Sequence, residues 1–129
     1  MIALFFLLAG AADAQPQWSC DDPGPQQEMN YCAAQEYHAA DRALNAQWKR
    51  TAAAMKQRDA QWDAPNDNRP GHFASLLSAQ RAWLKYRDAH CQTAGYSFRG
   101  GSMEPLIVST CKTALTERRT QQLNLLIEP

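Results

Sequence analysis

Apolar side chains recur at helical spacing along the first half of the chain. Between about Gln26 and about Gln61 they follow one another at steps of four and seven residues, and they are Met29, Ala33, Tyr37, Leu44, Trp48 and Met55. This periodicity predicts one long helix, and the many alanines of the stretch favour that conformation intrinsically. The segment Pro23-Gly24-Pro25 prevents an earlier start.

Two further helical stretches follow, and each is preceded by a loop. Segment 65–71 is rich in Pro, Asn and Gly and predicts the first loop. The helical pattern resumes at Phe73 and ends near Gly95, which suits the position after a helix C-terminus. A second loop runs to 101, and Ser102 is a suitable N-cap for a last helix that ends near Leu126.

No segment shows the alternation of apolar and polar residues that is typical of a strand, and no internal repeat is present. The sequence therefore predicts an all-α fold, a three-helix up-down-up bundle with a long first helix. Residues 15–129 are the right length for one such domain.

The first fourteen residues predict a signal peptide. Ile2–Leu8 is an apolar stretch too short to span a bilayer, and Ala12-Asp13-Ala14 has the small-x-small pattern of a cleavage site. We therefore expect a mature protein that starts at Gln15 and is periplasmic or secreted. No Lys or Arg precedes the apolar stretch, so either the terminal amine acts alone or the true start lies upstream of Met1.

The sequence contains four cysteines, which are Cys20, Cys32, Cys91 and Cys111. An even number of cysteines in a short exported chain indicates disulfides rather than reactive thiols. In an up-down-up bundle all four gather at one end. We favour a Cys20–Cys32 bond that holds the N-terminal arm and a Cys91–Cys111 bond that holds the second loop. The residues alone leave the two crossed pairings open.

The charge balance argues against nucleic acid and membrane partners. Lys and Arg number 13, Asp and Glu also number 13, and the formal net charge at pH 7 is +0. A neutral chain has no electrostatic attraction for a polyanion or an anionic membrane. The residues before Cys20 do not form a lipobox, so we expect no membrane anchor. A protein partner is the remaining expectation.

Two charged residues, Asp41 and Arg87, fall on the apolar faces of the predicted helices. Buried charges need partners. If Cys32 and Cys91 are level in the bundle, the helical rise separates Asp41 from Arg87 by roughly 7–8 Å along the axis, within reach of an arginine side chain. Arg119 falls at nearly the same height as Asp41. We expect a structural polar network that contains Asp41, Arg87 and Arg119, with Gln80 nearby.

No set of residues indicates catalysis, a metal or a cofactor. Asp41 held by arginine is the best catalytic carboxylate, but no second carboxylate shares its face for acid–base work. His38 lies three residues before Asp41, and no third metal ligand follows at helical spacing. We therefore expect neither an enzyme nor a metalloprotein.

The loop that follows Gly95 is the candidate partner-binding surface. It contains two aromatic residues, an arginine and two glycines, which are Tyr96, Phe98, Arg99, Gly100 and Gly101. Aromatic and arginine side chains on a rigid loop are typical of protein interfaces. The alternative is a flexible connector whose aromatic rings pack on the bundle. Trp18 and Trp62 are secondary candidates, with a core-capping role as their alternative.

Several motifs occur in a fixed order after residue 14. They are Cys20, the run Glu28–Tyr37, Asp41 with Leu44-Asn45, Ala79–Leu84 with Arg87-Asp88 and Cys91, Gly100–Ser102, and Cys111 with Leu115–Thr120 and Leu123. This set resembles the lysozyme inhibitor LprI-like domain of bacterial exported proteins, and the resemblance covers nearly all of the chain after the leader. The resemblance also supports the favoured disulfide pairing.

The resemblance implies a helical periplasmic or secreted protein that inhibits lysozyme. Our first hypothesis is that the chain binds a lysozyme-type muramidase, with Arg99 entering a cleft lined by catalytic carboxylates. An immunity protein against a peptidoglycan-degrading toxin is a variant of this hypothesis. The second hypothesis is an envelope scaffold or accessory protein that does not contact lysozyme.

Overall fold

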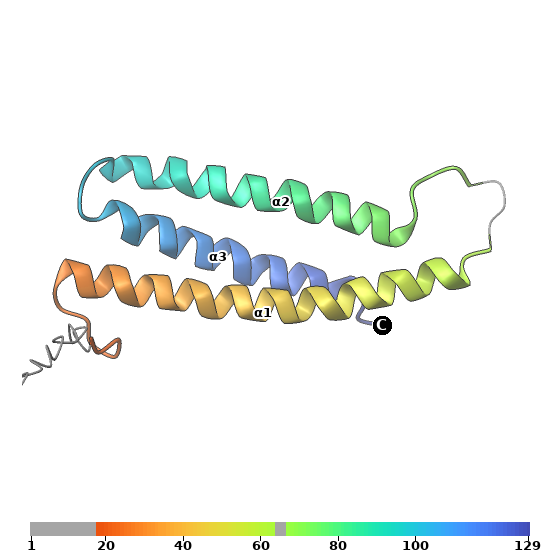
Figure 1. Ribbon diagram of the computed structural model, residues 1–129, viewed down its shortest axis with the longest axis horizontal. Coiled ribbons are helices and arrows are strands. Elements are labelled where there is room, and N and C mark those ends of the chain that lie inside the picture. The colour runs from red at the N-terminus through yellow and green to blue at the C-terminus, as the bar shows by residue number, and fades with distance from the viewer. Residues whose placement is uncertain (1–17, 64–66) are drawn as a thin grey trace, which may run out of the picture.

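The computed structural model describes residues 18–63 and 67–129, and within these ranges the chain is helical and contains no strand. Helix α1 spans Gln26–Gln61, α2 spans His72–Gly95, the short 3₁₀ helix η1 spans Tyr96–Phe98, and α3 spans Glu104–Leu125. The three long helices run antiparallel to their neighbours in sequence (Figure 1). The predicted all-α up-down-up bundle with a long first helix is therefore confirmed. The predicted signal peptide lies outside the described residues.

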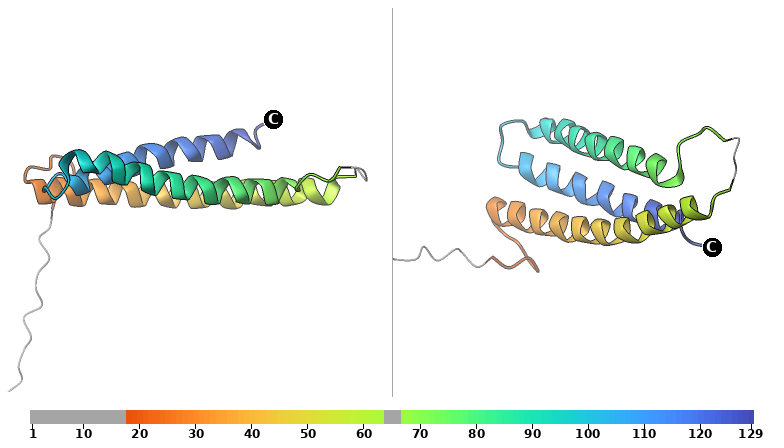
Figure 2. Two further views of the ribbon diagram at one scale, coloured as in Figure 1. Left: turned by 90° about the horizontal axis from the view of Figure 1, so that it is seen from above. Right: turned by 45° about the vertical axis from the view of Figure 1, so that its right-hand side comes forward.

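Helix α3 runs at an angle to α1 and α2. Toward its C-terminus it leaves the layer formed by these two helices (Figure 2, left) but stays bonded to α1, because Thr51 and Arg58 donate to its last carbonyls. Helix α3 packs most extensively on α1 and also contacts α2. This course leaves a hollow between the three helices at the end where α1 passes into α2.

Gly95 has a different role from the one that the sequence predicts. It is the last residue of α2, with a φ of −63°, and the chain continues directly into η1. A Cβ atom built at Gly95 would lie 2.6 Å from Cγ2 of Val108 on α3. The position therefore needs glycine for the close approach of two helices and not for a left-handed turn.

The start of α3 also differs from expectation. Met103, not Ser102, occupies the N-cap position, and no side chain caps the helix through a hydrogen bond. Glu104 and Pro105 stand in the first turn of α3. The carboxylate of Glu104 accepts a hydrogen bond from the N–H of Gly100, which ties the start of α3 to the preceding loop.

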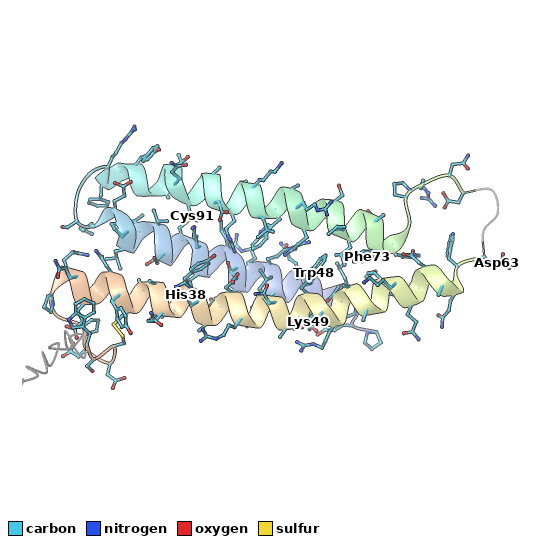
Figure 3. The ribbon with its side chains drawn as sticks, in the orientation of Figure 1. His38, Trp48, Lys49, Asp63, Phe73 and Cys91 are labelled. Atoms are coloured by element: carbon cyan, nitrogen blue, oxygen red, sulfur yellow. A yellow bond between two sulfur atoms is a disulfide. The ribbon has the colours of Figure 1, made fainter. Side chains whose placement is uncertain are left out.

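The apolar core is small and lies in the half of the bundle away from the disulfides. It consists of Leu44, Ala52, Met55, Leu76 and Leu123, against which Trp48, Phe73, Trp83 and Ile127 pack. Trp48 and Phe73 bridge α1 and α2, with their ring centroids 6.3 Å apart (Figure 3). The periodic residues of each helix thus meet in one cluster.

A buried polar chain joins α1 to α3 beside this core. The hydroxyl of Thr51, fully buried, donates to the backbone carbonyl of Leu123 at 2.9 Å. The same hydroxyl accepts a hydrogen bond from the side-chain amide of Gln47 at 3.1 Å. Arg50 in turn donates to Gln47 at 2.7 Å. Because each polar group has a partner, the core tolerates them.

Two disulfides fasten the opposite end of the bundle. Cys20 is bonded to Cys32, with Cα atoms 5.4 Å apart, and Cys91 to Cys111, with Cα atoms 5.5 Å apart. The favoured pairing is confirmed. The first bond ties the N-terminal arm to α1, and the second joins the end of α2 to the second turn of α3.

Candidate functional site

The loop between α2 and α3 presents an exposed aromatic and cationic surface. Tyr96 is 39% exposed and Phe98 is 42% exposed. The guanidinium of Arg99 lies over the Tyr96 ring, 4.4 Å from its centroid. The loop, continued to Met103, surrounds a shallow hollow of about 480 Å³. The predicted residues are therefore brought together on one surface.

The backbone of this loop is held by short hydrogen bonds. Gly100 has a φ of +79°, a conformation that disfavours other residues, and its N–H donates to the Glu104 carboxylate at 2.6 Å. The N–H of Gly101 donates to the carbonyl of Phe98 at 2.8 Å. These bonds set the loop conformation, and the Cys91–Cys111 disulfide joins the two helices at its base.

The N-terminal arm is attached to the same end of the bundle. The amide of Asn30 on α1 donates to the carbonyl of Ser102, which links α1 to the loop. The Trp18 ring packs edge-on against Tyr31 at 5.1 Å between centroids. The carboxylate of Glu28 accepts hydrogen bonds from the N–H groups of Ser19 and Gly24. Further aromatic surface therefore lies at this end.

The expected polar network divides into two separate groups. In the first, Arg87 is 5% exposed, and its guanidinium lies 3.7 Å from the Asp41 carboxylate. Its Nε donates to Asp88 at 3.0 Å, and the guanidinium stands between the rings of Tyr37 and Trp83, at 5.3 and 5.2 Å. This group stabilises the packing of the three helices.

In the second group, Nε of Arg119 donates to the side-chain oxygen of Gln80 at 2.9 Å. Arg119 also donates to Gln122 at 3.3 Å. The described contacts join Arg119 to neutral amides, and none joins it to Asp41. The sequence predicted Arg119 at nearly the height of Asp41, but its side chain bonds to Gln80, apart from the Arg87–Asp41 group.

The three histidines have aromatic or carboxylate neighbours. His38 packs near Tyr37, His90 stacks on Tyr86, and His72 bonds to Asp59. Over residues 18–63 and 67–129, no group of three His, Cys, Asp or Glu side chains is arranged to hold a metal ion.

A larger hollow lies at the opposite end of the bundle, where α3 leaves the layer formed by α1 and α2. Its volume is about 790 Å³, and it lies between the end of α1, the start of α2 and the last turns of α3. Trp62, 58% exposed, is on its wall. The sequence offered Trp62 as a secondary candidate but gave no sign of this hollow, because its walls come from three separate segments.

The start of α2 beside this hollow is capped from another helix. The Asp59 carboxylate on α1 accepts hydrogen bonds from the N–H groups of His72 and Phe73, at 2.6 and 3.0 Å. It also contacts Nδ1 of His72 at 2.9 Å. The sequence shows only that Asp59 lies near the end of the first helix, and this position does not indicate which groups it contacts.

None of the described helices combines the length and the hydropathy that crossing a bilayer requires. A small helical domain with two disulfides is typical of extracytoplasmic proteins. Residues 20–123 match the protein family described as Lysozyme inhibitor LprI, and the chain belongs to this family.

The chain is also similar to an uncharacterized protein of Rhizobium meliloti (strain 1021). The two are 42% identical over 129 residues, which cover 98% of this chain and 93% of the relative. No solved structure matches the chain.

Proposed function

We propose that this protein is an exported, non-catalytic inhibitor that binds a lysozyme-type muramidase by direct protein contact. The observation that carries the proposal is the match to the lysozyme inhibitor family over residues 20–123, which include all three helices up to Leu123 and both disulfides. The two disulfides support an oxidising compartment. The predicted leader, residues 1–14, would deliver the protein there.

The loop with Tyr96, Phe98 and Arg99 is the surface that we propose for this contact. Muramidases use a pair of carboxylates that flank the scissile bond in an open cleft. A cationic side chain on a fixed loop complements such a cleft in charge, and neighbouring aromatic rings supply contact area. Arg99 is held over Tyr96, so little conformational freedom is lost on binding.

The decisive experiment measures lysis of bacterial cell walls by c-type, g-type and phage-type lysozymes in the presence of the purified, oxidised protein. The proposal expects stoichiometric inhibition of one class. A reduced and alkylated sample is the matched control, because it has the same sequence without the disulfide-held loop base.

Absence of inhibition against every class would refute the muramidase proposal. The fold would then be that of an envelope scaffold or accessory protein, or of an immunity protein for one peptidoglycan-degrading toxin. Chemical cross-linking in the envelope followed by identification of the partner separates these alternatives.

A further inference from the structure

The hollow between the ends of α1 and α2 and the last turns of α3 has an apolar floor and a cationic rim. Met55 and Leu76 belong to the core and form part of its lining, and Trp62 and Leu126 extend the apolar surface outward. Leu126 is 46% exposed. The volume of the hollow, about 790 Å³, falls in the range of pockets that hold a small ligand or a few residues of a peptide.

Arg119 is the partly buried cation of this hollow, and the described residues give it no counter-ion. Its described hydrogen bonds go to two neutral amides, those of Gln80 and Gln122. Its Nη2 is buried and has no hydrogen-bond partner among the described residues. The guanidinium is partly desolvated, and this burial lowers the pKa of Arg119 from its ordinary value. A desolvated cation gains strongly from a carboxylate partner.

The other charged groups around the hollow already have partners. Arg69 makes a close ion pair with Asp67, at 2.6 Å. His72 is bonded to Asp59, and Arg58 donates to the backbone carbonyl of Leu126 at 3.1 Å. Arg58 and Arg119 therefore have no described counter-ion, and of the two only Arg119 is partly buried, next to apolar surface.

Access to the Arg119 guanidinium requires little rearrangement. Its bond to Gln122 is long, at 3.3 Å, and Gln122 is exposed. An incoming carboxylate can displace this amide while the 2.9 Å bond to Gln80 keeps the guanidinium in place. A neutral and long hydrogen bond is then replaced by a charge-assisted one.

We propose that this hollow binds a peptide segment of a partner protein that presents a carboxylate beside an apolar side chain, with Arg119 pairing with the carboxylate. The charge of Arg119 selects the carboxylate, and the surface formed by Met55, Leu76, Trp62 and Leu126 receives the apolar side chain. The site is at the opposite end of the bundle from the loop that contains Arg99 (Figure 1). It is a second binding surface and does not depend on the muramidase proposal.

The test titrates the oxidised protein with N-acetyl-leucine and follows the indole signal of Trp62 and the amide signals of Ser75 and Leu126 by NMR. A ligand this small binds only in about the millimolar range, which NMR measures well. N-acetyl-leucinamide is the matched ligand without the negative charge. We expect the acid to bind at least about tenfold more tightly than the amide.

Two variants assign the charge effect to one residue. Arg119→Gln should remove the preference for the acid, whereas Arg118→Gln, the same change at an exposed neighbour, should retain it. Leu126→Glu places a competing carboxylate at the rim and should also abolish binding of the acid. Leu126→Glu alters an exposed residue, so it keeps the test valid if Arg119→Gln unfolds.

Several outcomes overturn the proposal. Equal affinity for the acid and the amide would mean that the site does not recognise the carboxylate. Equal losses of affinity for the acid in Arg118→Gln and Arg119→Gln would mean that only the net charge of the protein matters. Absence of any shift on addition of the acid would exclude the site. If decanoate were bound more tightly than N-acetyl-leucine by more than its longer chain explains, the ligand of the hollow would be a free fatty acid and not a peptide.

Discussion

The carboxylate of Asp59, near the end of α1, accepts a hydrogen bond of 2.6 Å from the N–H of His72, the first residue of α2. The residue before α2 is Gly71, which has no side chain to cap the helix. Asp59 therefore supplies from another helix the cap that a local Ser or Asp normally provides.

Asp59→Asn should destabilise the protein in a pH-dependent manner. Hydrogen bonds from the N–H of Phe73, and also from the N–H and ring of His72, lower the pKa of Asp59 below its ordinary value of 3.8, against a smaller opposing effect of burial. A lowered folded-state pKa contributes stability above the ordinary pKa, and this contribution is lost as the pH falls through the folded value. The melting temperature of the variant should therefore fall by a few degrees at pH 7, and the difference should vanish in acid.

Asp63→Asn is the matched control for this prediction. Asp63 is exposed and lies beyond the end of α1 (Figure 3), so the same loss of charge should leave the melting temperature almost unchanged. A pH-independent difference between Asp59→Asn and the parent protein would contradict the capping role of the carboxylate.

Gly95→Ala should destabilise the bundle by about 1–3 kcal/mol, because the new methyl group would overlap Val108. The double variant Gly95→Ala with Val108→Ala should recover part of this loss by making room. Gly24→Ala, where the methyl group would meet open space, is the control and should be neutral. Urea unfolding of the four proteins gives the comparison, and a stable single variant would refute the close-packing explanation.

Arg87→Ala should cost about 2–4 kcal/mol, because it removes a buried side chain that packs between the rings of Tyr37 and Trp83. Asp41→Ala should cost under about 1 kcal/mol, since its carboxylate is 3.7 Å from the guanidinium and 37% exposed. A double-mutant cycle should give a coupling below about 1 kcal/mol. A coupling several times larger would mean that the ion pair, not the packing, stabilises this region.

Replacing Cys91 and Cys111 together with serine should lower stability by about 3 kcal/mol, the amount expected for closing a loop with a sequence separation of 20. Hydrogen exchange should then become faster in η1 and the first turn of α3. The corresponding change at Cys20 and Cys32 should accelerate exchange mainly in the N-terminal arm. Equal exchange in the loop of all variants would show that hydrogen bonds alone hold it.

Arg99→Ala should weaken muramidase inhibition by at least about tenfold if the loop enters the cleft, because a charged anchor at an interface centre is commonly worth 2 kcal/mol or more. The helical circular-dichroism signal should not change. Arg81→Ala, an equal loss of charge about 20 Å along α2 from the loop, is the control. An unchanged inhibition constant for Arg99→Ala would remove this loop from the proposed contact.

Much of the fold was accessible from the sequence because it is encoded locally. The spacing of apolar residues and the position of Pro25 predicted α1 with the bounds that the structure shows. The bounds of α2 and α3 were predicted to within about two residues. The cysteine positions followed from the same topology, since three antiparallel helices bring Cys91 and Cys111 to one end.

What the sequence left undecided depends on side-chain direction and on contacts between distant segments. Helical rise placed both Arg87 and Arg119 within reach of Asp41, but only the tertiary structure pairs Arg87 with Asp41 and Arg119 with Gln80. The need for glycine at position 95 comes from Val108 on another helix.

The same reason separates the two candidate binding surfaces. The residues of the loop around Arg99 are contiguous, so their composition alone identified them as a candidate. The hollow beside Arg119 is formed by three segments and by the oblique course of α3 relative to α1 and α2. The sequence by itself determined the helices, their order and the end that the cysteines hold, because local periodicity and chain connectivity encode these features. Only the tertiary structure decided which charges are paired and where the bundle is open, because packing between helices sets both.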